Sequence, residues 1–247
     1  MTTSLPIRTA TTEIISNDTP ILAYLAEPGG EGPFPAVVVV QEVFGVNAHI
    51  RAVADRFARA GYVAIAPHIY HRQAPGFEVG YAQAELELGR KYKVGTRADE
   101  LLSDVQAAVA LLHSKANVKA NGVGCIGFCF GGHVAYLAAT LPAIKATASF
   151  YGAGITSLTP GGGEPTLTRT REIAGTLYGF FGSKDPLIPL EEVDQIKAEL
   201  AKQDVPHQVF IYEGAGHGFF CDQRDSYHPQ AADAAWRQVM QLFKETL

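Results

Sequence analysis

Cysteine is scarce in this chain, which excludes a fold held together by a framework of disulfide bonds. The 247 residues contain three cysteines, an odd and small number, whereas disulfide-rich secreted domains carry larger, even sets. We therefore expect a reducing compartment. The segment 1–16 has no long apolar stretch after a basic one, so we expect no signal peptide and a cytoplasmic location.

Long hydrophobic runs and clusters of basic residues are missing as well. No apolar run reaches the roughly 20 residues that span a bilayer, and the formal net charge of −5 comes without a basic stripe. We therefore expect neither a membrane nor a nucleic acid as partner. Hydrophobic residues still make up 47% of the chain and charged residues 18%, which allows a substantial core. We expect a single domain over residues 1–247.

Short apolar runs alternate with helical patterns along almost the whole chain. The valine run at 36–40 is typical of a strand buried on both faces of a parallel sheet. Further strands are expected at 62–66, 122–126, 144–151, 176–181 and 208–212, and helices at 50–60, 81–92, 99–114, 133–141, 190–202 and 229–243. Residues 11–16 and 21–26 predict an antiparallel hairpin, and 152–175 a long exposed loop. The predicted fold is α/β, a mostly parallel sheet with helices on both faces and an N-terminal antiparallel hairpin.

The most informative stretch is 127–132, which reads Gly-Phe-Cys-Phe-Gly-Gly between a predicted strand and a predicted helix. The pattern G-x-C-x-G matches the nucleophile elbow of α/β-hydrolases, with cysteine at the position of serine. Side chains at the glycine positions would collide with the neighbouring strand and helix. Cys129 is therefore predicted as a nucleophile at a helix N-terminus, where an anionic sulfur is favoured. The alternative is a core-filling cysteine, which we expect for Cys125 and Cys221.

Three further residues with catalytic chemistry follow predicted strands, namely Glu42, Asp185 and His217. Ligands bind at the carboxyl ends of the strands in such sheets, so we expect these residues to meet Cys129 there. The order cysteine, aspartate, histidine is that of an α/β-hydrolase. His217 would take up the thiol proton and return it to the leaving group. Asp185 would hold the imidazole in the right tautomer.

Negative charge that develops on a carbonyl oxygen needs hydrogen-bond donors. The backbone N–H of Phe130, directly after the predicted nucleophile, is one candidate for this oxyanion hole. The N–H of Val43, in the loop after an early strand, is the expected second donor.

Each of these residues also has a simpler interpretation. Asp185 precedes a proline and is equally well explained as the start of a turn. His217, which lies between glycines, has a solvated loop histidine as its rival, and Glu42 is either a solvated charge or a buried carboxylate. The other histidines are assigned surface or structural roles: His49, His68, His71, His113, His133, His207 and His228. No spacing typical of zinc is present, so neither a metal nor a cofactor is expected.

Several segments together resemble the dienelactone hydrolase family (carboxymethylenebutenolidases). The matching segments are 41–47, 70–76, 127–132, 182–186 and 216–219. The resemblance implies an α/β-hydrolase fold with a Cys129–His217–Asp185 triad. It also implies that Glu42 holds the resting thiol and helps to deprotonate it when substrate binds, which limits oxidation of the cysteine. The type reaction of the family opens a cyclic enol-lactone through a thioester, which water then hydrolyses.

The type enzymes of the family bind a substrate carboxylate through two arginines. Arg224 is a candidate for one of them, and Phe44, Tyr81 and Phe219 are candidates for lining an apolar pocket. The sequence therefore predicts a cysteine-dependent hydrolase of a small-molecule lactone or ester, as a monomer or weak homo-oligomer. The alternatives are a carboxylesterase for an unrelated small ester and a non-catalytic ligand-binding protein of the same fold. A serine-type enzyme is disfavoured, because no serine occupies the elbow.

Overall fold

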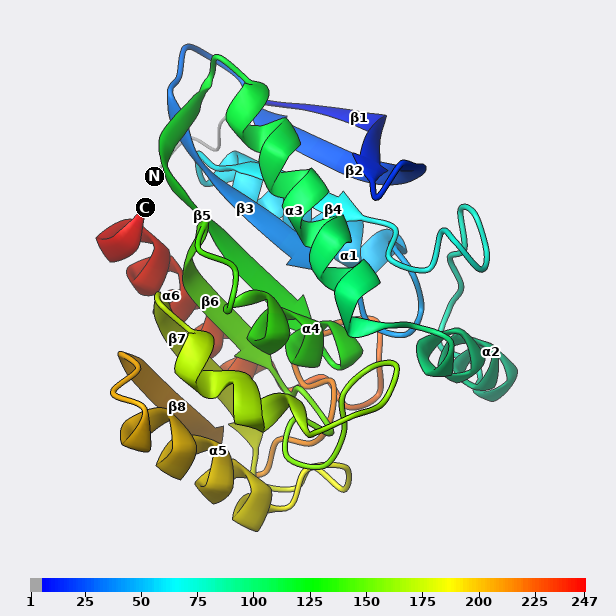
Figure 1. The fold of residues 1–247 in the computed structure, drawn as a ribbon, viewed down its shortest axis with the longest axis vertical. Helices are drawn as coiled ribbons and strands as arrows, with labels where there is room; N and C mark the ends of the chain where they lie inside the picture. The colour runs from blue at the N-terminus through cyan, green and yellow to red at the C-terminus, as the bar shows by residue number, and fades with distance from the viewer. Residues whose placement is uncertain (1–5) are drawn as a thin grey trace.

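The computed structural model describes residues 6–247, so the first five residues of the expected domain 1–247 lie outside it. The described residues form one eight-stranded sheet (Figure 1). The strands are β1 (Ile7–Ser16), β2 (Thr19–Pro28), β3 (Phe34–Val40), β4 (Val63–Pro67), β5 (Val118–Phe128), β6 (Ile144–Phe150), β7 (Thr176–Gly182) and β8 (His207–Tyr212). The helices are α1 (Ala48–Arg59), α2 (Gln83–Val94), α3 (Ala98–Ser114), α4 (Phe130–Ala138), α5 (Leu190–Lys202) and α6 (Pro229–Thr246).

The strand order confirms the predicted mostly parallel sheet with an antiparallel hairpin at its edge. The order is β1-β2-β4-β3-β5-β6-β7-β8. The strands from β4 to β8 in this order pair in parallel. β2 pairs antiparallel with both β1 and β4. All the parallel strands therefore end at the same edge of the sheet, where chemically active side chains from different strands can meet.

Helices cover both faces of the sheet, with α3, α4 and α5 in front and α1 and α6 behind in Figure 1. The buried residues form two hydrophobic clusters, and β3 contributes to both. Val37 and Val39 belong to one cluster and Val38 and Val40 to the other, and none of the four is exposed. Because side chains alternate across a strand, burial on both faces requires an unbroken apolar run. This is the physical reason for the run of four valines that ends β3.

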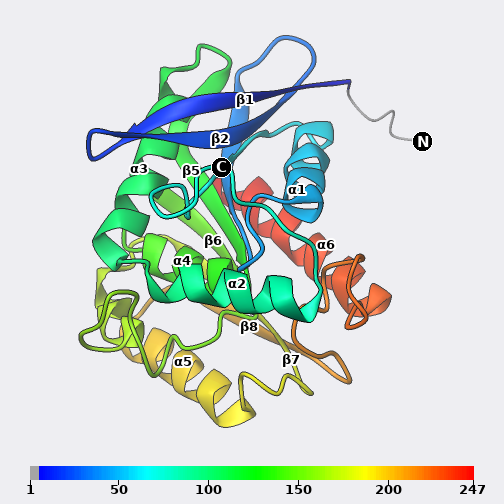
Figure 2. The ribbon, with the colours of Figure 1, turned by 90° about the vertical axis from the view of Figure 1, so that its right-hand side faces the viewer.

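The helix α2 lies beyond the carboxyl ends of the parallel strands, facing the viewer in Figure 2. Its Gly89 packs so closely that a Cβ there would overlap the carbonyl oxygen of Val43. The helix therefore packs directly against the loop that follows β3. Among residues 6–247, no helix combines the length and the apolar character needed to cross a membrane.

The segment 152–175 differs from the exposed loop that we predicted. It contains a short 3-10 helix, Thr166–Glu172, whose Thr166 and Thr170 are fully buried. Thr166 Oγ1 lies 2.7 Å from His133 Nε2, and Thr170 Oγ1 lies 2.6 Å from the hydroxyl of Tyr136. The threonines are buried because α4 offers polar partners, a circumstance that the composition of the segment does not reveal.

Candidate active site

The structure confirms a strained strand-to-helix turn at Cys129. This residue has φ 55° and ψ −117°, a region that non-glycine residues rarely occupy. A Cβ on Gly127 would overlap the carbonyl oxygen of Gly131, and a Cβ on Gly131 would overlap that of Gln41. The glycines are therefore required by the close approach of α4 to the ends of β3 and β5. The turn places the thiol at the N-terminus of α4, where it is partly exposed.

His217 and Asp185 meet at the same edge of the sheet. Asp185 follows β7 and His217 follows β8, and His217 Nδ1 lies 2.8 Å from Asp185 Oδ2. The other carboxylate oxygen of Asp185 accepts a hydrogen bond of 2.8 Å from the N–H of Leu187. Asp185 thus fits both interpretations of the sequence, since it forms a turn with one oxygen and holds the imidazole with the other. Both side chains are largely buried.

The free nitrogen of His217 faces the thiol of Cys129. His217 Nε2 is buried and makes no hydrogen bond of regular geometry to any described residue. The two groups are nevertheless close enough for their charges to interact. Burial alone would lower the pKa of His217, but the negative charge of Cys129 and the hydrogen bond to Asp185 raise it to about 10. The site therefore favours the cationic form of the His217 imidazole.

Two backbone N–H groups near Cys129 donate to no described residue. One belongs to Phe130 in the first turn of α4, where helix geometry leaves N–H groups without partners. The other belongs to Val43, whose loop follows the strand that pairs with β5 at Gly127. These are the two donors that the sequence predicts for an oxyanion, and both remain available for a ligand.

Glu42 is a buried carboxylate, not a solvated charge. Its exposed fraction is 1%, and its Oε1 accepts a hydrogen bond of 2.9 Å from Arg224 Nη1. Its Oε2 has no hydrogen-bond partner among the described residues. Burial alone would lower the pKa of Arg224, but the charge of Glu42 and then that of Cys129 raise it. In this arrangement Glu42 is paired with Arg224, and it makes no hydrogen bond to the thiol of Cys129.

Of the four predicted substrate-binding residues, three lie together. The rings of Phe44 and Tyr81 meet edge to face with centroids 4.7 Å apart, and the guanidinium of Arg224 lies 5.6 Å from the first ring and 5.8 Å from the second. A cleft of about 310 Å³ is lined by Tyr81, His217, Gln223, Arg224, Asp225 and Ser226. Phe219 is fully buried among core aromatic residues and packs against Tyr151. Its position does not favour a role in lining the cleft.

A second cleft lies on the α2 side of the elbow. Its volume is about 580 Å³, and its lining includes Phe130, Val94 and Leu158 together with the basic residues Arg90 and Lys93. Lys93 Nζ lies 5.5 Å from the ring of Phe130. This cleft therefore combines apolar surface with positive charge.

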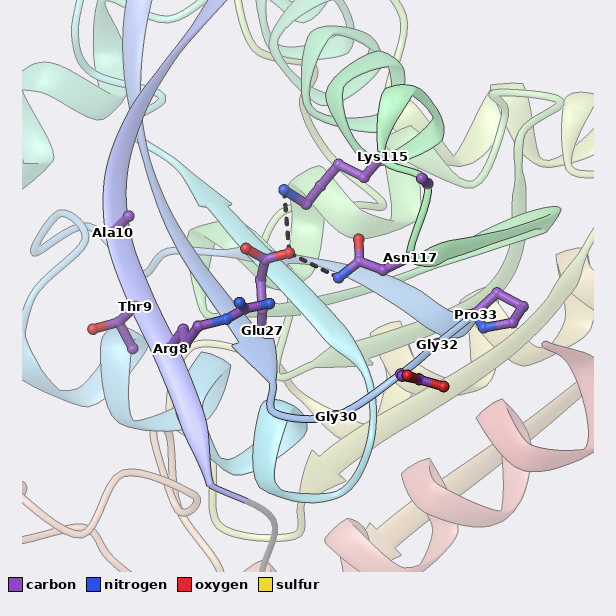
Figure 3. A pocket seen from close by; sticks show the side chains of 11 residues that line it. Arg8, Thr9, Ala10, Glu27, Gly30, Gly32, Pro33, Lys115 and Asn117 are labelled. Atoms are coloured by element: carbon purple, nitrogen blue, oxygen red, sulfur yellow. Dashed lines mark hydrogen bonds and ion pairs between the residues drawn. The ribbon is translucent and has the colours of Figure 1, made fainter.

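A hollow larger than these two clefts lies elsewhere and has different chemistry. It measures about 720 Å³ and lies beside the first residues of β3 and β5 (Figure 3), the opposite end of the sheet from Cys129. Its central carboxylate, Glu27, is already 3.1 Å from both Lys115 Nζ and Asn117 Nδ2. No nucleophile lines this hollow. Choosing the active site by the volume of a hollow would therefore select the end of the sheet that lies away from Cys129.

Sequence reasoning missed two residues next to Glu42. Cys221 is buried as predicted, but it is not a plain core residue, because its thiol donates a hydrogen bond of 3.2 Å to the hydroxyl of Tyr81. His49, from the first turn of α1, is also buried. One ligand atom each of Glu42, His49 and Cys221 lies within 4.8 Å of the other two. The three residues come from separate segments, so no spacing in the sequence indicates the group.

The remaining titratable groups of this region are neutralised by burial. Burial lowers the pKa of His49, although the charges of Glu42 and Asp222 oppose the shift. Burial, and then the charge of Glu42, raises the pKa of Cys221 to about 11. Cys125 lies inside β5, where burial raises its pKa to about 12, in agreement with its predicted role in the core.

The parallel sheet covered by helices on both faces and the cysteine at a sharp strand-to-helix turn define an α/β-hydrolase fold. Residues 21–247 match the dienelactone hydrolase family, and the chain belongs to that family.

A protein of Synechocystis sp. named "Putative carboxymethylenebutenolidase" is 53% identical over 244 residues, with 99% of both chains covered. A Bradyrhizobium sp. protein named "Probable 2-oxo-3-(5-oxofuran-2-ylidene)propanoate lactonase" is 35% identical over 92% of this chain and 90% of its own length. A crystal structure named "Putative Dienelactone Hydrolase", from Klebsiella pneumoniae subsp. pneumoniae, has a TM-score of 0.86 and 29% identity, covering 97% of this chain and 99% of that one.

Proposed function

We propose that this chain is a cysteine-dependent hydrolase of a lactone or small ester, built as one domain over its whole length. One observation carries the proposal: a thiol at a strained turn faces a buried histidine whose other ring nitrogen lies 2.8 Å from an aspartate oxygen. An unperturbed thiol is mostly protonated at neutral pH and needs a partner to become a good nucleophile. The raised pKa of His217 supports a cationic imidazole that can donate a proton during the reaction.

In the first half of the reaction, the sulfur of Cys129 attacks the carbonyl carbon of the substrate. The carbonyl oxygen becomes negative and accepts hydrogen bonds from the N–H groups of Phe130 and Val43. The bond between the carbonyl carbon and the ring or ester oxygen then breaks. The imidazolium of His217 gives its Nε2 proton to that oxygen, which leaves a thioester on Cys129 and a neutral imidazole.

In the second half, water replaces the leaving group. Neutral His217 takes a proton from a water molecule at Nε2, and the hydroxide attacks the thioester carbon. The carbon–sulfur bond breaks, the carboxylic acid product forms, and the thiolate is restored beside the imidazolium. Asp185 accepts the hydrogen bond from His217 Nδ1 and stabilises the cationic ring.

Glu42 and Arg224 are assigned to the control of the thiol. The resemblance to the family implies that Glu42 contacts the thiol in the resting enzyme and helps to deprotonate it. In the structure, Glu42 is paired with Arg224 instead. This pairing fits the second state, in which the carboxylate no longer contacts the thiol and the sulfur faces His217. Arg224 would then compensate the charge of a carboxylate that is only 1% exposed.

The substrate class follows from the clefts and from the names of the relatives. The cleft of about 310 Å³ beside His217 suits a small ring, and the relatives cited above are named for butenolide or furan lactones. Arg90 and Lys93 line the neighbouring cleft and would favour a substrate that carries an anionic group. We therefore propose an anionic lactone or small ester as the preferred substrate.

The test uses Cys129→Ala and His217→Ala with an activated short-chain ester and with lactones that do or do not carry a carboxylate. Both variants should lose turnover while their circular dichroism and melting temperature stay close to those of the parent. Turnover retained in both folded variants would eliminate the proposal. Equal kcat/KM for the charged and uncharged lactones would refute the anionic preference alone.

A further inference from the structure

Two buried polar atoms beside the active site lack partners, and their residues lie next to the same thiol, that of Cys221. They are Glu42 Oε2 and His49 Nε2, and neither makes a hydrogen bond to any described residue. Their residues are 1% and 4% exposed, and the neighbouring Cys221 is 0% exposed. A buried polar atom without a partner is destabilising, so its retention calls for a ligand or another explanation.

We propose that Glu42, His49 and Cys221 form a Zn²⁺-binding site beside Cys129, and that Zn²⁺ bound there inhibits hydrolysis by taking up the carboxylate of Glu42. The inhibitory half of this proposal rests on the role proposed above for Glu42. The binding half rests on the geometry alone.

The donor set suits a borderline-soft divalent ion. One carboxylate oxygen, one imidazole nitrogen and one thiolate sulfur are the ligand types that Zn²⁺ takes in proteins. Such ligands lie about 2.0–2.3 Å from the ion, hence roughly 3–4 Å from each other. The three atoms lie within 4.8 Å of one another, so small side-chain rotations suffice. On binding, the thiol of Cys221 releases its proton and sulfur bonds to the ion, with no change in oxidation state.

Neighbouring groups orient two of the ligands as outer partners of a metal site do. His49 Nδ1 lies 4.0 Å from Asp222 Oδ1, and its Nε2 is buried without a hydrogen-bond partner among the described residues. The His49 ring is held between Phe128 and Phe220, with centroids 5.8 and 6.3 Å away. Arg224 holds Oε1 of Glu42 and leaves Oε2 for the ion. The positive charge of Arg224 also weakens cation binding, so we expect a reversible inhibitory ion, not a permanent structural one.

The active-site cleft offers a route for the ion. Tyr81 lines that cleft, and its hydroxyl accepts the hydrogen bond from the thiol of Cys221. A movement of Tyr81 would open the thiol to the cleft. The same opening leaves the fourth coordination position to water or to the tyrosine hydroxyl.

The binding test starts from Cys129→Ser, because the thiol of Cys129 and the imidazole of His217 could themselves bind the ion. The substitution removes this second source of a thiolate signal. Reduced Cys129→Ser protein is titrated with Co²⁺, which reports a bound thiolate through a charge-transfer band in the near ultraviolet. We expect one Co²⁺ per chain with this band. Adding Cys221→Ser should abolish the band, whereas adding Cys125→Ala, which changes a buried thiol without polar partners, should preserve it.

Two results would overturn the site. One is the absence of the band in Cys129→Ser protein, and the other is its persistence after Cys221→Ser. A second variant, His49→Gln added to Cys129→Ser, keeps the thiols of Cys125 and Cys221. It tests the site even if Cys221→Ser fails to fold. Competition with a chromophoric chelator should show at least tenfold weaker Zn²⁺ binding for His49→Gln than for its parent, and equal binding would contradict the assignment of His49.

The inhibition test compares the native sequence with Cys221→Ser, each relative to its own turnover without metal. Zn²⁺ should inhibit the native enzyme, and the inhibition constant should rise at least tenfold in Cys221→Ser. Equal inhibition constants for the two proteins would refute inhibition through Cys221. The inhibiting ion would then be bound at Cys129. If the native enzyme hydrolyses no ester or lactone, the proposed function fails, whereas the Co²⁺ result on the inactive Cys129→Ser protein still decides the metal site.

Discussion

Cys125 and Cys129 lie four residues apart, yet the fold gives them opposite chemistry. Cys125 lies inside β5, is 0% exposed and has its pKa raised to about 12 by burial. Cys129 lies one residue beyond the same strand, at a positive φ, and faces a histidine. The comparison teaches that the point at which the chain leaves the sheet decides whether a cysteine is enclosed in the core or lies at a partly exposed turn beside a histidine.

Removing each thiol in turn should give the largest contrast. Cys129→Ala should lower kcat/KM by about 10³-fold or more, since it removes the nucleophile. Cys125→Ala should keep activity within a few-fold and lose about 1 kcal/mol of stability, because it leaves only a small cavity. Steady-state kinetics and denaturant unfolding measure the two effects. Comparable activity losses in the two variants would break the distinction between them.

Asp185→Asn should give the next largest effect. The amide cannot stabilise a cationic imidazole, so we expect kcat/KM to fall by about 10²-fold or more and the alkylation of Cys129 by iodoacetamide to slow. Alkylation of Cys125 should stay negligible until the protein unfolds. Mass spectrometry after timed alkylation gives both rates, and an unchanged rate at Cys129 would contradict the coupling through His217.

The turn itself can be tested at Gly131. A Cβ there would overlap the carbonyl oxygen of Gln41, so Gly131→Ala should cost about 3 kcal/mol or more of stability. Gly216→Ala is the control, because a Cβ there would meet only the carbonyl oxygen of Lys184 at 3.8 Å. Denaturant unfolding of both variants tests whether the elbow glycines are required by sterics. Equal stability of the two would refute that explanation.

The charge interaction between Cys129 and His217 predicts a smaller, directional effect. Burial lowers the pKa of His217, while the anionic sulfur and Asp185 raise it to about 10. Without the sulfur, burial is opposed by Asp185 alone, so Cys129→Ser should lower this pKa by more than one unit. Cys125→Ala should leave it unchanged. Titration of isotope-labelled histidine by NMR measures both, and an upward shift in Cys129→Ser would reverse the assigned sign.

The parts of the structure that depend on local sequence were predictable. The valine run of β3 and the glycines around Cys129 identify a buried strand and a sharp turn, because each pattern reflects a local steric requirement. The order of Cys129, Asp185 and His217 then places three side chains at one edge, since parallel strands end together.

The contacts that sequence reasoning missed join distant segments. Glu42 and Arg224 are 182 positions apart, and only the folded chain shows that they pair. Cys221 was predicted as core from residue type alone, and its contact with Tyr81 depends on where α2 packs. The buried Thr166 and Thr170 were predicted as exposed because their partners, His133 and Tyr136, lie on another helix. Polar burial follows from tertiary partners, not from composition.

The most direct test of the central claim is to trap the acyl-enzyme with a slowly hydrolysed lactone or ester. Trypsin releases Cys125 and Cys129 together in the peptide 120–145, so fragment ions must locate the added mass. We predict a hydroxylamine-sensitive thioester on Cys129, absent from Cys129→Ala and retained in Cys125→Ala. Turnover without any acyl group on Cys129, or an acyl group located on Cys125 or Cys221, would contradict a nucleophilic role for the cysteine at the turn.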